Sequence, residues 1–314
     1  MLHFLRESDF TRPLIEEVFS LAREFKRTRS IGHPRTLEGQ SWALLFYKNS
    51  TRTRISFEVA IRELGGHPVV LSSNTTQINR GESVADSMGV FNRYLHGIII
   101  RTHGQEIIDT FARYATIPVV NALTDLLHPC QIYSDVLTIM ERFHVDSPYQ
   151  LAGRTVAFFG DTASNMANSL LLAGHLFGFE VRLSGPESFV PGAEITALLS
   201  RLGAPSPGPL FNDPLEAARG ADVLYTDVWV SMGDEAEEEI RIKKMRPFSV
   251  TPQVLASAQQ DAIFMHCMPT HPGFEVSEEV LASPASILLD QAENRLHMQK
   301  AILSVLAEDL RSTR

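Results

Sequence analysis

Residues 50–54 (Ser-Thr-Arg-Thr-Arg) place three hydroxyl groups and two guanidinium groups on five consecutive positions. An apolar run, 42–46, precedes them, and apolar residues at helical spacing follow from Ile55 to Leu64. This pattern predicts a buried strand that leads directly into a helix. A helix N-terminus exposes unpaired backbone N–H groups and the positive end of the helix dipole, so it favours a bound anion. Because hydroxyl and guanidinium donors suit phosphate oxygens, we predict an anion site here rather than a solvated basic turn.

Two further motifs place polar side chains next to apolar segments. Arg101 follows the apolar run 97–100, where a guanidinium is costly unless it faces an anion or an acid; the alternative is a structural salt bridge. His128 precedes Pro129, which suits the first turn of a helix, so its imidazole would lie near the positive end of the dipole and stay neutral. We expect His128 to donate to a carbonyl oxygen, with the Gln131 amide one turn further on. A capping role for His128 without a ligand is the alternative.

The chain has two cysteines, which provide no disulfide framework and indicate a reducing compartment, the cytoplasm. We expect Cys130 to be buried in a helix and Cys267 to end a strand, where it can contact a substrate. Neither has the partner that a covalent nucleophile needs, so packing or polar contact is favoured. The spacing of His266, Cys267 and His271 does not match a structural zinc site, so we predict no metal.

Residues 160–165 stand where a dinucleotide-binding fold places its phosphate loop, but they lack the G-x-G-x-x-G spacing. A nicotinamide-dependent dehydrogenase is therefore the weaker alternative. The acidic run 234–239 is interpreted as a solvated face.

Alternating strands and helices have to position these residues. The alternation predicts an α/β fold with two domains, each a parallel sheet flanked by helices. Ligands of such sheets bind beyond the carboxyl ends of the strands, where the polar motifs fall, so we expect a cleft between the two domains. Expected strands lie at 42–46, 69–71, 97–100, 118–121, 155–159, 181–183, 221–225, 262–265 and 286–289, and expected helices at 12–27, 55–64, 84–94, 106–115, 128–143 and from about 165.

A length of 314 residues suits two domains. We place the first at 1–147 and the second at 148–293, because Pro148 interrupts the helical pattern. A final helix, about 294–314, is expected to cross back to the first domain.

The composition is that of a soluble globular protein, with 44% apolar and 21% charged residues. A net charge of -9 argues against broad attraction to nucleic acid or membrane, so any phosphate site must be a local basic pocket. No apolar run approaches the roughly 20 residues that a membrane span needs. The N-terminus has no signal-peptide or transit-peptide pattern.

Taken together, the motifs resemble those of the ornithine carbamoyltransferases, in that family's order and spacing and over nearly the whole chain. The motifs at 50–54 and 128–131 are shared across carbamoyltransferases, whereas the Ser-Met-Gly motif at 231–233 and the His-Cys-x-Pro motif at 266–269 are narrower and point to the ornithine branch. The motifs are Ser50-Thr51-Arg52-Thr53-Arg54, Arg101-Thr102, His128-Pro129-Cys130-Gln131, Asp227-x-x-x-Ser231-Met232-Gly233, His266-Cys267-Met268-Pro269 and Ala292-Glu293-Asn294-Arg295-x-His297.

The resemblance implies a role for each matching position. Gln77 matches a position that reaches a neighbouring subunit's site, which implies a homotrimer. Met268 replaces the more usual Leu, a change of little consequence if only its backbone is used. The implied carbamoyl-phosphate-binding residues are Ser50, Thr51, Arg52, Thr53, Gln77, Arg101, His128, Gln131, Cys267, Met268 and Arg295. The implied catalytic residues are Arg101, His128, Cys267 and Arg295, and the implied ornithine-binding residues are Asn165, Asp227, Ser231 and Met232.

The implied reaction transfers the carbamoyl group of carbamoyl phosphate to the side-chain amine of L-ornithine, giving L-citrulline and phosphate. It works by electrostatics and positioning, and it needs no metal or cofactor. Two alternatives stay open: a carbamoyltransferase for another amine such as putrescine, and a catalytically silent regulatory homologue. The place in arginine metabolism, biosynthetic or catabolic, is open as well.

Overall fold

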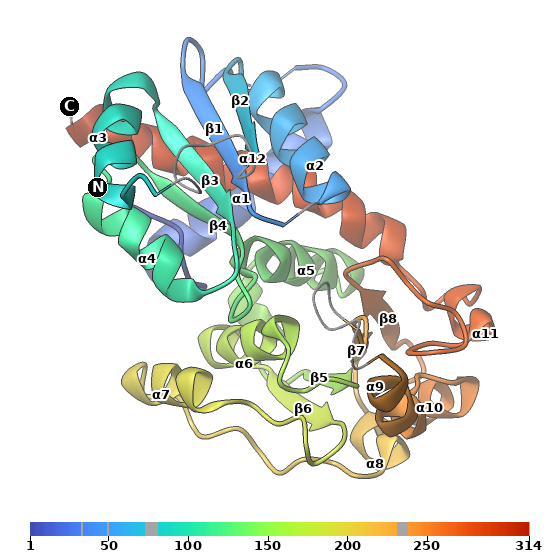
Figure 1. Cartoon of the computed structure of the whole chain (residues 1–314). Helices are drawn as coiled ribbons and strands as arrows, with labels where there is room; N and C mark the ends of the chain where they lie inside the picture. The colour runs from blue at the N-terminus through green and yellow to red at the C-terminus, as the bar shows by residue number, and fades with distance from the viewer. Residues whose placement is uncertain (33, 49, 73–80, 231–237, 314) are drawn as a thin grey trace. The chain divides into compact units, whose positions relative to one another are not determined.

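The computed structural model describes residues 1–32, 34–48, 50–72, 81–230 and 238–313. The chain divides into two compact units: unit 1 is Met1–Phe143 with Glu293–Arg314, and unit 2 is His144–Ala292. Each unit contains a four-stranded parallel sheet, so the expected α/β class with two parallel sheets is confirmed (Figure 1). Among the described residues, no helix is long and apolar enough to cross a membrane.

The sheet of unit 1 has the strand order β2-β1-β3-β4. Pro68 is tolerated in β2 because this strand lies at the edge of the sheet. In the other three strands of this sheet consecutive residues are buried and mostly apolar, because both faces of a parallel sheet are covered. The strands are β1 (Ser41–Phe46), β2 (His67–Ser72), β3 (Gly97–Arg101) and β4 (Val119–Leu123). The helices are α1 (Arg12–Thr28), α2 (Thr51–Glu63), α3 (Val84–Tyr94), α4 (Gln105–Tyr114), α5 (Pro129–Arg142) and the last helix, α12 (Leu288–Thr313).

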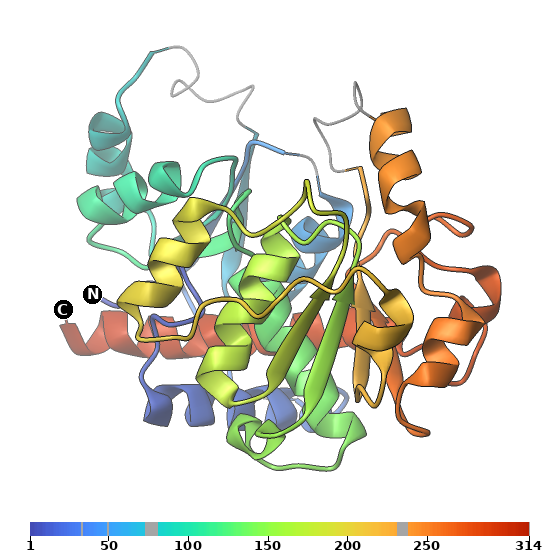
Figure 2. The ribbon, with the colours of Figure 1, turned by 90° about the horizontal axis from the view of Figure 1, so that it is seen from below.

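Helices pack on this sheet through their apolar faces. Met88 of α3 and Ile108 and Phe111 of α4 join the core formed by β1 and β3. The last helix lies alongside α1, where the Lys26 ammonium donates to the Asn294 side-chain oxygen at 2.9 Å (Figures 1 and 2). The expected return of the C-terminal helix to the first part of the chain is therefore confirmed.

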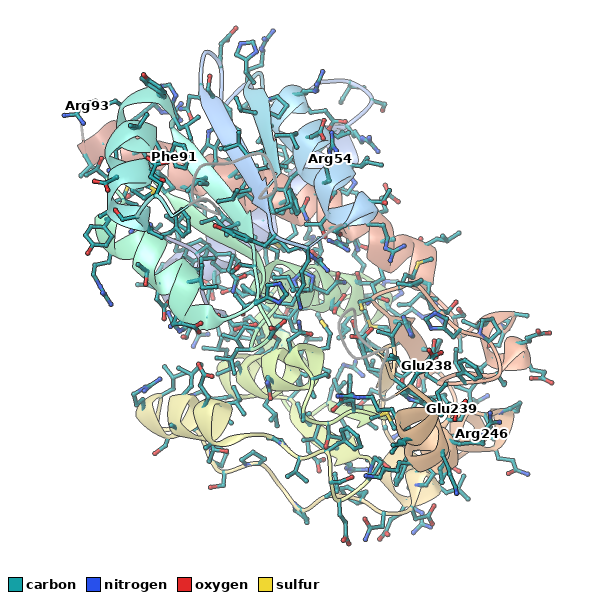
Figure 3. The ribbon with its side chains drawn as sticks, in the orientation of Figure 1. Arg54, Phe91, Arg93, Glu238, Glu239 and Arg246 are labelled. Atoms are coloured by element: carbon teal, nitrogen blue, oxygen red, sulfur yellow. The ribbon has the colours of Figure 1, made fainter. Side chains whose placement is uncertain are left out.

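Unit 2 repeats the arrangement with the strand order β6-β5-β7-β8. The acidic run was expected to be a solvated face, and its described members, Glu238 and Glu239, are exposed on the first turn of α9 (Figure 3). The strands are β5 (Thr155–Phe159), β6 (Glu180–Ser184), β7 (Val223–Thr226) and β8 (Ile263–His266). The helices are η3 (Pro148–Leu151), α6 (Asn165–Phe177), α7 (Ala193–Arg201), α8 (Pro214–Ala218), α9 (Glu238–Met245), η5 (Arg246–Phe248), α10 (Pro252–Ser257) and α11 (Glu278–Leu281).

One expected strand, 286–289, is wrong. Ser286 forms only an isolated bridge with Phe264, and α12 already begins at Leu288. A four-residue apolar run is too short to distinguish a strand from the first turn of a helix, and the side chain of Leu289 is in fact 78% exposed.

Candidate active site

The strand register brings the polar motifs of unit 1 to one edge of its sheet. Phe46 of β1 pairs with Arg101 of β3, which pairs with Leu123 of β4. Parallel strands end at the same edge, so the segments that follow these three strands emerge together. Arg101 is the last residue of β3, and Ser50 and His128 belong to the segments that follow β1 and β4.

The strand-to-helix turn at residues 50–54 is confirmed. Ser50 is the N-cap of α2, and its side-chain oxygen accepts the backbone N–H of Thr53 at 3.3 Å. The side chain of Arg54 differs from the expectation, because its Nε donates to Glu58 at 2.6 Å one turn further along α2 (Figure 3). Arg54 is therefore exposed and held along the helix, and the loop retains the hydroxyls and the exposed Arg52.

Two guanidinium groups meet at the hydroxyl of Thr53. Arg295 of α12 donates to Thr53 Oγ1 at 2.7 Å, and Arg101 at the end of β3 donates to the same oxygen at 3.5 Å. All three residues are buried, with Arg101 only 9% exposed. Buried positive charge beside a helix N-terminus gives a strongly positive spot that suits a phosphate group.

His128 lies within the influence of the same two arginines. Burial lowers the pKa of His128 well below its usual value, and the positive charges of Arg295 and Arg101 lower it further. The expected neutral imidazole agrees with this direction, but burial is the main cause rather than the helix dipole. His128 can therefore donate a hydrogen bond without carrying a charge.

Gln131 lies one turn into α5 and is 1% exposed. Its side-chain amide donates to Asp135 Oδ1 at 2.8 Å, which fixes the orientation of the amide group. Its Oε1 has no hydrogen-bond partner among the residues that the structure describes. A buried acceptor of this kind suits an N–H donor on a ligand.

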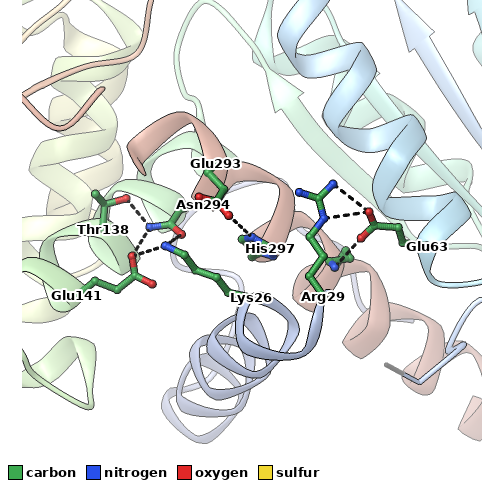
Figure 4. Close-up of polar contacts among 9 residues, drawn as sticks. Lys26, Arg29, Glu63, Thr138, Glu141, Glu293, Asn294 and His297 are labelled. Atoms are coloured by element: carbon green, nitrogen blue, oxygen red, sulfur yellow. Dashed lines mark hydrogen bonds and ion pairs between the residues drawn. The ribbon is translucent and has the colours of Figure 1, made fainter. Parts of the chain in front are cut away.

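Arg295 is held in place by its neighbour Asn294. The Asn294 amide donates to Thr138 Oγ1 at 3.0 Å and to Glu141 Oε2 at 2.7 Å, both on α5 (Figure 4). Lys26 of α1 donates to the same Glu141 oxygen at 2.8 Å. This network fastens α12 to α1 and α5 next to the position that carries Arg295.

A second ion pair fastens α12 to α2. The Lys300 ammonium lies 2.7 Å from Glu63 at the C-terminal end of α2. Arg29 lies 3.1 Å from the same carboxylate (Figure 4). The Lys300 side chain is fully buried and lies over the ring of Phe25, 5.3 Å from its centroid. The helix that supplies Arg295 is thus fixed to the helix whose N-terminus carries the anion loop.

In unit 2 the register again aligns three strand ends, since Phe159 of β5 pairs with Thr226 of β7, which pairs with His266 of β8. Asp227 and Cys267 follow these strands, and the Cys267 thiol donates to Asp227 Oδ1 at 2.8 Å. A thiol that donates to a carboxylate carries its proton, which favours polar contact over nucleophilic attack.

The turn after β5 depends on Gly160, whose φ is +108°. A Cβ at this position would lie 2.7 Å from the indole nitrogen of Trp229. The turn leads to Asp161, which pairs with Arg241 at 2.9 Å, and to the half-buried Asn165 at the start of α6. Asp161 therefore has a structural partner, and Asn165 is the first residue of α6.

Three residues with an implied role, Gln77, Ser231 and Met232, lie outside the described residues. The structure brings together Thr53, Arg101, His128 and Arg295 in unit 1 and Asp227 with Cys267 in unit 2. The shared cleft stays a prediction.

Two family profiles match the chain. The aspartate/ornithine carbamoyltransferase carbamoyl-P binding domain matches residues 2–141, and the Asp/Orn binding domain of the same family matches residues 152–306. The chain belongs to the aspartate/ornithine carbamoyltransferase family. The dehydrogenase alternative is thereby set aside.

Similar proteins are named for the ornithine branch of these carbamoyltransferases. An ornithine carbamoyltransferase of Parafrankia sp. (strain EAN1pec) is 46% identical over 98% of this chain and 96% of the relative. The structure of the Pyrococcus furiosus ornithine carbamoyltransferase has a TM-score of 0.87 and 42% identity, covering 96% of this chain and 95% of that one. The structure of the anabolic ornithine carbamoyltransferase from Campylobacter jejuni has a TM-score of 0.88 and 37% identity, covering 98% and 100%.

The carbamoyltransferase motif at 266–268 also gathers potential metal ligands. Single ligand atoms of Asp227, His266 and Cys267 lie within 4.8 Å of one another. All three groups are engaged in hydrogen bonds, because His266 Nδ1 accepts the N–H of Met268 at 2.8 Å and the Cys267 thiol donates to Asp227. We assign this arrangement to hydrogen bonding, and the absence of a resident metal stays a prediction.

Sequence reasoning missed the residues that fix the helix and the loop carrying the candidate site residues. Asn294 and Lys300 fix α12, and Glu275 contacts His266 from the loop that follows β8. Asn294 could have been given a role because it precedes Arg295 in the motif at 292–297. No local pattern marks Lys300, whose partner Glu63 lies far away in the sequence. None marks Glu275 either, because its contact with the His271 N–H depends on the conformation of an irregular loop.

Proposed function

We propose that this chain transfers the carbamoyl group of carbamoyl phosphate to the side-chain amine of L-ornithine, giving L-citrulline and phosphate. The observation that carries the proposal is the pair of buried guanidinium groups, Arg101 and Arg295, at the hydroxyl of Thr53. Two fixed positive charges at a helix N-terminus suit a phosphate that must bind and then leave. The names of the similar proteins support ornithine as the acceptor.

Unit 1 acts on carbamoyl phosphate. The neutral His128 donates to the carbamoyl oxygen, and Gln131 Oε1 accepts from the carbamoyl amide. As the new C–N bond forms, the bond between the carbamoyl carbon and the phosphate oxygen breaks, its electron pair leaves with phosphate, and the phosphate takes up the proton that the amine nitrogen loses. Arg101 and Arg295 stabilise that charge. The phosphate-binding residues are Ser50, Thr51, Arg52, Thr53 and Arg101.

Unit 2 acts on ornithine. Asp227 pairs with the α-ammonium, and Asn165, Ser231 and Met232 bind the α-carboxylate. Cys267 and the Met268 backbone contact the reacting carbamoyl group. The deprotonated side-chain amine of ornithine is the nucleophile, so the thiol forms no covalent intermediate.

The domain assignment follows the same division. Residues 1–147 with the helix 294–314 bind carbamoyl phosphate, and residues 148–293 bind ornithine. We propose a homotrimer, with Gln77 reaching the site of a neighbouring subunit. Free cysteines at both positions suit the reducing cytoplasm. The anabolic names of similar proteins support a biosynthetic role in arginine metabolism.

A panel of acceptors tests this function. Phosphate release and product formation are measured with carbamoyl phosphate and each of L-ornithine, putrescine, N-acetylornithine and L-aspartate. Putrescine lacks the α-carboxylate and N-acetylornithine lacks the α-ammonium, so each omits one group that unit 2 is proposed to bind. We expect citrulline from ornithine and little product from the others. Preference for putrescine would reassign the acceptor, and no product with any amine would indicate a silent homologue.

A further inference from the structure

Glu275 is a fully buried carboxylate in the loop between β8 and α11 of unit 2. Its Oε1 accepts the backbone N–H of His271 at 2.5 Å and lies 3.3 Å from Nε2 of His266. A carboxylate without access to water is costly unless donors surround it. Both contacts are made by Oε1, whereas Oε2 has no hydrogen-bond partner among the described residues, so Oε1 is the atom that fixes Glu275 inside the loop.

His266 connects this carboxylate to the Met268 peptide. Nδ1 of His266 accepts the backbone N–H of Met268 at 2.8 Å, so this nitrogen carries no proton. A neutral imidazole then carries its proton on Nε2, the atom that faces Glu275. The imidazole is itself buried, with the residue 1% exposed. Nε2 lies 3.3 Å from Glu275 Oε1 but has no hydrogen-bond partner among the described residues, so Glu275, His266 and Met268 are linked by one electrostatic contact and one hydrogen bond.

The Met268 backbone needs such support. Its φ is +61°, in the left-handed region that residues other than Gly rarely adopt. A strained conformation persists only where the surrounding contacts hold it. Glu275 holds the loop from both sides, through His266 before Met268 and through the His271 N–H after it.

We propose that Glu275 is a positioning residue that sets the Cys267–Met268 peptide for carbamoyl transfer. It acts through His266 and the His271 amide, and its own side chain contacts no substrate. The conformation of this peptide also affects the contact with Asp227, because the Cys267 thiol donates to that carboxylate. The catalytic consequence rests on the proposed function, whereas the conformational consequence does not.

The conformational part is tested by thiol reactivity. Cys130 is 1% exposed, donates to the carbonyl of Asn121, and has a pKa that burial raises far above its usual value, so it reacts poorly. Reaction of the folded chain with 5,5′-dithiobis(2-nitrobenzoic acid) therefore reports on Cys267. We expect Glu275→Ala to change its rate constant by about tenfold, because a released loop breaks the contact with Asp227. Glu278→Ala, an exposed carboxylate at the start of α11, is the control and should leave the rate unchanged.

Conservative variants separate positioning from charge. Glu275→Gln keeps an oxygen that can accept both contacts of Oε1, so it should restore most of the parent behaviour. His266→Asn keeps an acceptor close to the Nδ1 position but removes the link to Glu275. In the His266→Asn background, Glu275→Ala should change the rate constant of the Cys267 thiol less than it does in the parent, because two residues that act through one contact have non-additive effects.

Catalysis is measured on the same variants. We expect Glu275→Ala to lower kcat by about 100-fold, because small misplacements of reacting groups have effects of this size. Inhibition by inorganic phosphate should stay unchanged, since the phosphate-binding residues belong to unit 1. A merely structural defect would weaken phosphate inhibition as well.

Two results would overturn the proposal: parent-like thiol reactivity in Glu275→Ala, or a fall in kcat that Glu275→Gln does not reverse. Should Glu275→Ala fail to fold, Glu275→Gln and His266→Asn carry the test, and an unchanged Cys267 rate in His266→Asn would then refute it. If the parent forms no citrulline, the proposed function fails, and the thiol measurements still decide whether Glu275 sets the peptide.

Discussion

Arg101 and Arg54 provide a matched pair of substitutions at the anion site. Arg101 is 9% exposed and donates to Thr53 Oγ1, whereas the Arg54 side chain is 56% exposed and pairs with Glu58. A hydrogen bond to a charged group contributes about 1.5–3 kcal/mol, and little solvent screens a buried guanidinium. Arg101→Ala should therefore weaken phosphate binding about 10- to 150-fold. Thr53 keeps a donor in this variant, because Arg295 still lies 2.7 Å from its hydroxyl.

Arg54→Ala removes an exposed i,i+4 pair, which contributes about 0.5 kcal/mol or less, so affinity should change about twofold or less. The assay is calorimetric titration with inorganic phosphate and with carbamoyl phosphate, together with kcat/KM at limiting carbamoyl phosphate. Circular dichroism shows that both variants are folded. Parent-like phosphate affinity in Arg101→Ala, or an equal loss in Arg54→Ala, would refute the reasoning.

Four further predictions concern other described contacts. Lys300→Met should lower the free energy of unfolding by about 2 kcal/mol. The loss is smaller than the about 3–5 kcal/mol expected when a fully buried pair is broken, because Glu63 is part-exposed and keeps Arg29 as a partner. Urea denaturation measures the loss, and a value below about 0.5 kcal/mol would contradict the prediction. The pKa of His128 is lower in the folded chain than in the unfolded one. Its contribution to stability is therefore present above about pH 6.5 and is lost as the pH falls toward the folded pKa, with a slope of at most about 1.4 kcal/mol per pH unit. In His128→Asn the melting temperature should therefore fall less steeply as the pH is lowered. Cys267→Ser should keep measurable activity with an altered KM for ornithine, and mass spectrometry during turnover should find no carbamoylated thiol in the parent. Asp227→Asn should reduce kcat/KM for ornithine far more than for putrescine, and equal losses would remove the proposed α-ammonium contact.

Much of unit 1 could be predicted because its local and long-range preferences agree. Residues 42–45 of the apolar run are buried, and Ser50 is a good N-cap, so strand, turn and helix follow from neighbouring residues. The direction of the His128 protonation equilibrium was predicted as well. Its main cause was not, because burial by the rest of the fold cannot be seen in a single motif.

The errors have physical causes that can be named. Arg54 was counted among the donors of the anion turn, and the structure pairs it with Glu58, four residues later, a spacing at which helical side chains pair. The run 286–289 was too short to decide between strand and helix. Glu275 went unnoticed because a buried carboxylate on an irregular loop looks, in sequence, like any solvated acid.

The bond between Arg295 and Thr53 joins residues 242 positions apart. A ribosome therefore makes the anion loop well before it makes the helix that carries Arg295. All of unit 2 is synthesised in between. A nascent or prematurely ended chain can therefore form the β1–α2 turn without gaining its second guanidinium. Until the helix with Arg295 has been made and packed, Thr53 Oγ1 lacks one of the two guanidinium groups that donate to it in the folded chain.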